Sequence, residues 1–208
     1  MLIGRISFDI FGLIAAGEFS ITTRVIRPGK TIELIESTMQ ANNKTCIVAR
    51  VWRMCTSDSS EIAGLEDQPV THPDQLPLWE GMTRWPGGYI QSLIVKVDPN
   101  HRAGHGIVWL SNEKAMVEGQ EKSDFVHLMG MVDTANGTAV RQEDPFTWSF
   151  PNLDLQIHLY RYPSGRWLGL ETVQQYGTDG IGLTSAILHD IHGPFGRSEQ
   201  ILTLRKMG

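Results

Sequence analysis

The stretch that decides the fold runs from residue 123 to residue 204, where one helical segment is followed by four strand-like segments. In chain order these segments are SDFVHLMGMVDTANG (123–137), NLDLQIHLYR (152–161), GRWLGLETVQQYG (165–177), IGLTSAILHD (181–190) and GPFGRSEQILTL (193–204). This order predicts an α+β fold in which a long antiparallel sheet wraps one helix. Such a fold suits a ligand with an elongated apolar tail.

The helix is predicted from its two ends and from the spacing of its apolar residues. Ser123 is a typical N-cap, and the Asn136-Gly137 pair is typical of a helix C-terminus. Between these ends, apolar residues recur at helical spacing at Phe125, Leu128, Met129, Val132 and Ala135. We therefore expect one central helix at about 123–137.

Residues 89–208 are predicted to form a single unit around this helix. Strands are expected before it, at 89–98 and 105–112. After it, the strands are joined by turn-forming connections, of which Tyr162-Pro163-Ser164-Gly165 is one. The unit therefore consists of strands, one helix and a long antiparallel meander.

Residues 1–56 are predicted to form a smaller meander of strands. Residues 2–10 alternate, with Ile6, Phe8 and Ile10 on one side, which is the pattern of a half-buried strand. Three further strands are expected at about 18–27, 31–40 and 45–54. No helical period of useful length occurs in this half of the chain.

Residues 57–88 are predicted to be a linker or covering loop between the two units. Four prolines interrupt this polar stretch, at Pro69, Pro73, Pro77 and Pro86. Proline at this density blocks both regular helices and strand ladders. Trp79 and Trp85 indicate that the stretch packs against another part of the protein.

The composition is that of a soluble globular protein, with 41% hydrophobic and 20% charged residues among 208. A net charge of −5 argues against general binding to nucleic acid or to anionic membranes. No apolar run approaches the roughly 20 residues of a membrane helix, and residues 1–12 do not read as a signal peptide. Two cysteines, Cys46 and Cys55, without metal-ligand spacing favour a reducing, cytoplasmic location.

Polar residues on three of the later strands are candidates for a site. Asp154 lies on one strand, Gln174 and Gln175 on the next, and Gln200 on the last. The side chains of these residues could converge in one groove.

The sequence resembles the acyl-CoA thioesterase II type of double hotdog protein. The resemblance is carried by RPGKTIELIESTMQANNKTCIVARVW (27–52), NLDLQIHLYRYPSGRWLGLE (152–171) and GIGLTSAILHDIHGPFGRSEQILTLR (180–205). In a hotdog fold an antiparallel sheet wraps one long helix, and this resemblance implies two such units in one polypeptide. It also implies hydrolysis of acyl-CoA or related acyl thioesters, without a metal or cofactor.

The resemblance further implies a catalytic set of Asp, Ser or Thr, and Gln on the second unit. Asp154 matches the aspartate and Gln200 the glutamine, while the third position falls at Gln175. Gln175 departs from the family because an amide is not a hydroxyl; Thr172 and Thr178 lie nearby. The resemblance also implies a backbone N–H that polarises the carbonyl, for which the N–H groups near 123–126 are candidates.

A complete first unit of this family would begin with another strand and its own helix, ahead of the strand at 2–10. Without that helix, the apolar face of the first meander needs another cover. The linker with Trp79 and Trp85, a second chain, or residues upstream of Met1 could supply it. A homodimer or higher homo-oligomer is therefore expected.

Other interpretations remain open from the sequence. The protein could bind an acyl thioester without turnover, because the third catalytic position lacks a hydroxyl. It could be a hotdog dehydratase, with Asp124 and His127 as its acid–base pair, or have a purely structural role. A metal site at His101 and His105 is disfavoured, since the glycines beside them prevent helical geometry.

Overall fold

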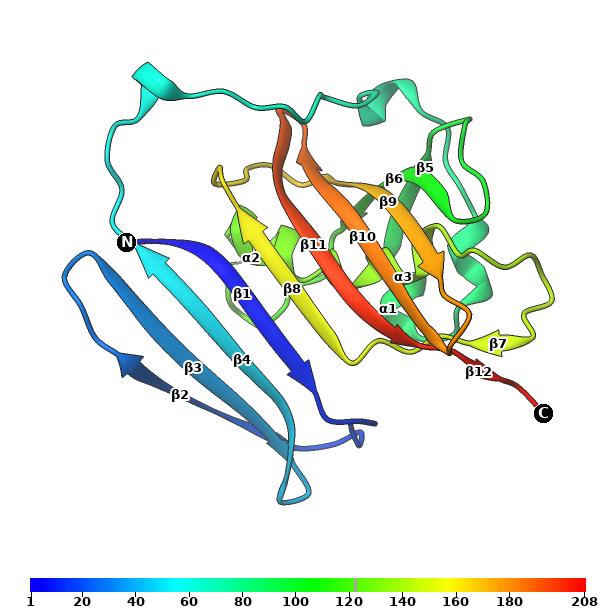
Figure 1. Ribbon diagram of the computed structural model, residues 1–208, viewed down its shortest axis with the longest axis horizontal. Helices are drawn as coiled ribbons and strands as arrows, with labels where there is room; N and C mark the ends of the chain where they lie inside the picture. Colours follow the sequence, from blue (N-terminus) through cyan, green and yellow to red (C-terminus); the bar gives the residue numbers. More distant parts are fainter. Residues whose placement is uncertain (122) are drawn as a thin grey trace.

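The computed structural model describes residues 1–121 and 123–208. Its main feature is one ten-stranded antiparallel sheet, in the spatial order β2-β3-β4-β1-β8-β11-β10-β9-β6-β5 (Figure 1). The strands of this sheet are β1 Leu2–Ile10, β2 Phe19–Arg27, β3 Ile32–Ala41, β4 Lys44–Met54, β5 Leu93–Val97, β6 His105–Asn112, β8 Asp154–Leu159, β9 Leu168–Tyr176, β10 Ile181–Asp190 and β11 Gly193–Thr203. A separate pair consists of β7 Trp148–Ser149 and β12 Arg205–Lys206.

The helical segments are short and lie mainly behind the second half of the sheet in Figure 1. They are η1 Ser60–Ile62, η2 Pro73–Gln75, η3 Gly81–Arg84, α1 Gly88–Gln91, α2 Asp124–Met129, η4 Val132–Thr134 and α3 Ala135–Thr138. An antiparallel sheet that curves around a central helical segment is the α+β fold expected from the sequence. No helix among the described residues is long and apolar enough to cross a membrane.

The four strands of the first half agree closely with the alternation in the sequence. The β3–β4 hairpin turns at Asn42 and Asn43, which have φ of 51° and 57°. Two consecutive residues with positive φ form the tight hairpin turn that matches the twist of the strands, and asparagine tolerates this conformation. The register of the hairpin is fixed by this turn, with Ala41 opposite Lys44.

The pairing of β1 with β8 joins the two halves into one sheet. Ile6 lies opposite Ile157 and Phe8 opposite Leu155, so apolar residues of both halves share one face. Ile6, Leu155 and Ile157 are all buried in the main core. This shared face is the inner face of the sheet, on which the central helical segment packs.

The central helical segment is less regular than predicted. One continuous helix was expected at 123–137, but the chain forms α2, η4 and α3 in succession. Ser123 does cap α2, because its Oγ accepts a hydrogen bond from the Val126 N–H at 3.3 Å. After Gly130, the Met131 N–H donates to the Leu128 carbonyl and the Thr134 N–H to the Met131 carbonyl. These bonds from residue i to residue i−3 tighten the chain into a 3₁₀ turn, which interrupts the α-helix.

A second correction concerns the predicted strand at 89–98. Residues 88–91 form the short helix α1, and the strand β5 begins only at Leu93. Hydrogen bonds from the Gln91 N–H to the Gly87 carbonyl and from the Ser92 N–H to the Tyr89 carbonyl hold the helical turn. Local hydrogen bonds therefore outweigh the β-propensity of this apolar stretch.

The linker between the halves packs against the second half. The Trp79 ring centroid lies 4.9 Å from that of His101, and the Trp85 centroid lies 5.6 Å from that of Phe146. The indole N–H of Trp109 donates to the Thr71 carbonyl at 2.9 Å. The two linker tryptophans therefore pack with residues of the second half and not over β2.

The apolar side chains of β2 stay exposed. Phe19, Ile21 and Val25 are 59%, 60% and 51% exposed. They lie opposite Ala41, Met39 and Ile35 on β3. This part of the sheet therefore presents an apolar surface at its edge.

Candidate functional site

A row of polar side chains crosses the inner face of the sheet. Gln174 on β9 pairs with Thr184 on β10, which in turn pairs with Gln200 on β11. All three are almost completely buried, at 0%, 1% and 0% exposure. Buried amides and hydroxyls need hydrogen-bond partners, and the central helical segment supplies them.

Asp133, in the 3₁₀ turn η4, receives two amide donors on one carboxylate oxygen. The Gln200 Nε2 donates to Asp133 Oδ1 at 2.8 Å, and the Asn152 Nδ2 donates to the same oxygen at 3.1 Å. Gln200 comes from β11, whereas Asn152 precedes β8. Three segments that are distant in the sequence therefore converge on one carboxylate.

Asn136 links the neighbouring part of the helical segment to the same polar row. Its Oδ1 accepts hydrogen bonds from Gln174 Nε2 and Thr184 Oγ1, both at 3.1 Å. The Gln174 Oε1 accepts from the Arg141 N–H at 2.9 Å, and its Nε2 also donates to the Asn136 carbonyl at 3.0 Å. The donors and the acceptor of Gln174 are thus fully used, so this side chain holds the helical segment against the sheet.

The environment of Asp133 changes its acidity. Close packing by protein atoms raises the pKa of Asp133, although the hydrogen bonds from Asn152 and Gln200 oppose this shift. The residue is nevertheless exposed, because it faces an open cavity. A carboxylate with a raised pKa is a better proton acceptor than an ordinary aspartate.

Gln200 retains one unused polar atom. Its Oε1 is buried and has no hydrogen-bond partner among the described residues. This oxygen is closed off from solvent, so Gln200 acts on Asp133 through its Nε2 amide group.

The cavity in front of Asp133 has a volume of about 710 Å³. Asn152, Asn136 and Thr134 share its polar edge with Asp133, and the remaining wall is mostly apolar and aromatic. This size lies within the range of roughly 300–1,000 Å³ that is usual for small-molecule sites. An apolar pocket with a few convergent polar groups is what an acyl thioester needs.

Of the three predicted site residues, only Gln200 belongs to this cluster. Asp154 lies on β8 with its side chain on the opposite face from buried Leu155, where its Oδ1 accepts from the Ile201 N–H at 2.8 Å. Gln175 is exposed and lies on the other face of β9 from buried Gln174. The structure therefore does not bring Asp154 and Gln175 together with Gln200. Their catalytic roles stay predictions.

The residues that sequence reasoning missed are Asp133, Asn136 and Asn152. Asp133 could have been noticed in the sequence, since it is the one carboxylate in the apolar segment between Phe125 and Ala135. An acidic side chain inside an apolar helical stretch is costly to bury and often functional. Asn152 could not, because an asparagine before a strand is an ordinary turn residue.

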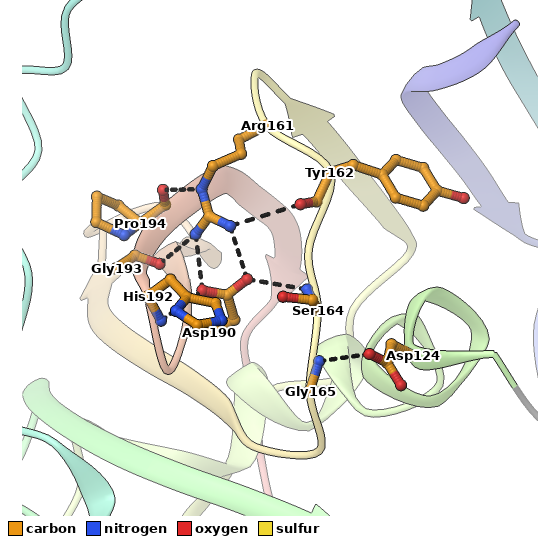
Figure 2. A network of polar contacts seen from close by, with 9 residues as sticks. All are labelled: Asp124, Arg161, Tyr162, Ser164, Gly165, Asp190, His192, Gly193 and Pro194. Atoms are coloured by element: carbon orange, nitrogen blue, oxygen red, sulfur yellow. Dashed lines mark hydrogen bonds and ion pairs between the residues drawn. The ribbon is translucent and has the colours of Figure 1, made fainter.

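The proposed oxyanion donors and the dehydratase pair have other partners. The Val126 N–H is used by the Ser123 cap. The Asp124 Oδ2 accepts from the Gly165 N–H at 2.7 Å (Figure 2), and the His127 Nε2 lies 2.9 Å from the Arg166 carbonyl. Asp124 and His127 thus both contact the backbone of the β8–β9 connection and do not converge on a shared reactive point.

A second polar cluster surrounds Asp190 at the end of β10 (Figure 2). The Arg161 guanidinium donates to both carboxylate oxygens, at 2.8 and 2.7 Å. The backbone N–H groups of Ser164 and His192 donate at 2.9 and 2.8 Å. Burial alone would raise the pKa of Asp190, but these hydrogen bonds outweigh it and lower the pKa. The cluster ties the β8–β9 connection to the β10–β11 turn.

Comparisons with known proteins place the chain in a family. Residues 66–204 match the acyl-CoA thioesterase C-terminal domain, and residues 2–54 match the acyl-CoA thioesterase N-terminal domain. No curated protein matches the chain.

Solved structures share the fold at low sequence identity. A hot dog fold protein of unknown function from Alicyclobacillus acidocaldarius is 10% identical, with a TM-score of 0.78 over 99% of this chain and 80% of that one. An acyl-CoA thioesterase II from Mycobacterium marinum is 14% identical, with a TM-score of 0.72 over 99% of this chain and 81% of that one. A Thermobifida fusca protein, provisionally described as a thioesterase II, is 16% identical, with a TM-score of 0.75 over 98% of this chain and 79% of that one. These similarities establish the hotdog fold.

Proposed function

Because the chain belongs to the acyl-CoA thioesterase family, we propose that it hydrolyses acyl-CoA or a closely related acyl thioester at Asp133. The observation that carries the proposal is the convergence of Gln200 and Asn152 on Asp133 Oδ1. This carboxylate stands at the wall of a cavity of about 710 Å³ that can receive the acyl group.

The reaction needs only modest help, because a thioester is an activated acyl donor. Asp133 accepts a proton from water as the water oxygen adds to the carbonyl carbon. The C–S bond then breaks, and the departing thiolate takes the proton, which leaves a carboxylic acid and a free thiol. Gln200 and Asn152 fix the orientation of the carboxylate through the hydrogen bonds that their amide groups donate to Asp133 Oδ1.

The direct test is release of free thiol from acyl-CoAs of short, medium and long chain by the purified protein. Asp133→Asn is expected to lower kcat by about 100-fold or more, since loss of a general base typically costs 10²–10⁴-fold. Gln200→Leu is expected to lower it as well. Both variants should remain folded, because an asparagine or leucine fits the same space.

Asp154→Asn is the matched comparison, because it removes in the same way a carboxylate that lies only two residues after Asn152. It is expected to keep the rate of the wild type within about threefold, since the hydrogen bonds of the Asp154 carboxylate to other described residues come from the Ile201 N–H and the Gln156 side chain. A collapse of activity in Asp154→Asn, with Asp133→Asn unaffected, would instead support the role that the sequence suggested for Asp154. Folded protein without turnover of any acyl-CoA would favour a binding protein.

A further inference from the structure

The wall of the cavity beside Asp133 is rich in aromatic rings. Five of its lining residues are aromatic: Trp85, Tyr89, Phe146, Trp148 and Phe150. They come from the linker, from α1 and from the segment between α3 and β8. The acyl group of a substrate whose carbonyl stands at Asp133 would lie against these rings.

Three of these rings form a corner with nearly perpendicular surfaces. The Trp85 and Phe146 centroids are 5.6 Å apart with an angle of 35° between the ring planes. Phe150 stands at 77° to Trp85 and at 76° to Phe146, with centroid distances of 5.8 and 5.9 Å. Aromatic rings attract one another in offset-stacked and edge-to-face arrangements. A planar ligand ring in this corner can stack in an offset manner on one wall and meet the other wall edge to face.

The corner is held in place by contacts that two of its rings make with neighbouring residues. The Trp85 Nε1 donates to the Gly137 carbonyl at 3.2 Å, and a Cβ on Gly137 would lie 3.0 Å from the same nitrogen, so glycine permits this approach. The Arg84 guanidinium lies 5.5 Å from the Phe146 ring centroid and 3.1 Å from the Asp144 carboxylate. Walls that are already ordered favour a rigid ligand, because neither side loses much freedom on binding.

A linear alkyl chain gains less binding free energy from such walls than a rigid ring does. It buries apolar area, but it must give up rotation about each of its bonds and it has no π-system for the rings to contact. Flexible acyl chains are better matched by adaptable methionine side chains. Among the described residues, the methionines that line the cavity are Met82 and Met207, beside five aromatic residues.

We propose that the preferred substrate carries an aromatic ring on its acyl group, seated in the corner formed by Trp85, Phe146 and Phe150. This inference rests on the proposed thioester hydrolysis and specifies its substrate class. The thioester carbonyl then reaches Asp133, and the thiol portion extends toward the mouth of the cavity, where Trp148 is 42% exposed.

The experiment compares phenylacetyl-CoA with octanoyl-CoA, which have eight acyl carbons each. For the wild-type protein, kcat/KM is expected to be about tenfold higher for the aryl thioester, the size expected from one or two aromatic contacts. In Phe146→Leu, which removes a ring but keeps an apolar side chain, this ratio should fall several-fold. In Ile90→Leu, which changes a cavity residue that has no ring, the ratio should stay as in the wild type.

Binding of the two corresponding non-hydrolysable thioether analogues separates this inference from the proposed function. Tighter binding of the aryl analogue, lost in Phe146→Leu, supports the aromatic site even if no thioester is hydrolysed, and only the proposed hydrolysis then fails. Equal or weaker binding and turnover of the aryl compounds by the wild type overturns the aromatic site, even if octanoyl-CoA is hydrolysed well.

Discussion

At the scale of single residues, Asp133 combines two requirements that usually conflict. In the proposed reaction its carboxylate must be ionised to accept a proton from water, yet its surroundings disfavour the charge. Packing raises its pKa, while the amides of Asn152 and Gln200 keep the carboxylate oriented. The cost of this arrangement is the kind of local destabilisation that functional sites often carry.

The raised pKa predicts the acid side of the pH–rate profile. In the proposed reaction the ionised form of Asp133 is the active one, so kcat/KM should fall as pH drops through the raised pKa. The midpoint should therefore lie above the value of about 3.9 for an ordinary aspartate. Initial rates at constant ionic strength measure it, and Asp154→Asn should leave the midpoint unchanged. A midpoint at or below the ordinary value would exclude Asp133 as the general base.

At the scale of elements, Asp190 links two connections between strands in the second half of the sheet through hydrogen bonds. Arg161 and Ser164 belong to the β8–β9 connection, and His192 belongs to the β10–β11 turn. The Asp190 side chain is fully buried, whereas Arg161 is 32% exposed. Four donors point at its two carboxylate oxygens, and the strongest of them is the positively charged Arg161 guanidinium.

Asp190→Asn is expected to lower the free energy of unfolding by about 3 kcal/mol, as is typical when one partner of a buried ion pair is removed. The pKa of Asp190 is lowered on folding. Its contribution is therefore complete above the pKa of the unfolded chain and is lost as pH falls through the lower, folded-state pKa. Urea unfolding at pH 7 and at lower pH measures both effects.

Glu113→Gln, which breaks the exposed pair with Arg166, is the control variant and should lower the free energy of unfolding by less than about 1 kcal/mol. An equal effect of the two substitutions would contradict the special role of Asp190.

At the scale of the whole molecule, the sheet ends in an uncovered apolar edge at β2. Phe19, Ile21 and Val25 expose more than half of their surface, and β2 pairs with a neighbour on one side only. Apolar edge strands tend to recruit another chain. We propose that the protein forms a homodimer or a higher homo-oligomer through this region.

Light scattering coupled to size-exclusion chromatography at micromolar concentration should therefore give at least twice the mass of one chain. Ile21→Lys, which places a charge on the edge strand, should shift the protein toward the monomer. Thr22→Lys, on the opposite face of the same strand, is the control and should shift it less. A wild-type protein that runs as a single monomeric species would contradict the proposal.

Much of the architecture could be predicted because strands and tight turns have characteristic local sequence patterns. The alternation of Ile6, Phe8 and Ile10 and the turn at 42–43 indicate a strand and a hairpin, and few other local structures fit these patterns. The helix at 123–137 was harder, since its apolar spacing is equally compatible with a 3₁₀ turn after Gly130. The choice between the two depends on packing against the sheet, which the spacing does not record.

The sequence by itself determined the antiparallel sheet, the central helical segment and, through its motifs, the thioesterase family. The tertiary structure alone decided which polar residues meet. Asp154 and Gln200 lie on adjacent strands, but the pleat turns their side chains to opposite faces. Asp133, Asn152 and Gln200 lie far apart in the sequence, and only the curvature of the sheet around the helical segment brings them to one carboxylate oxygen. The face to which a side chain points, and the contacts between residues distant in the sequence, are set only in the folded chain. The site was therefore found from the structure, whereas the fold could be predicted from the sequence.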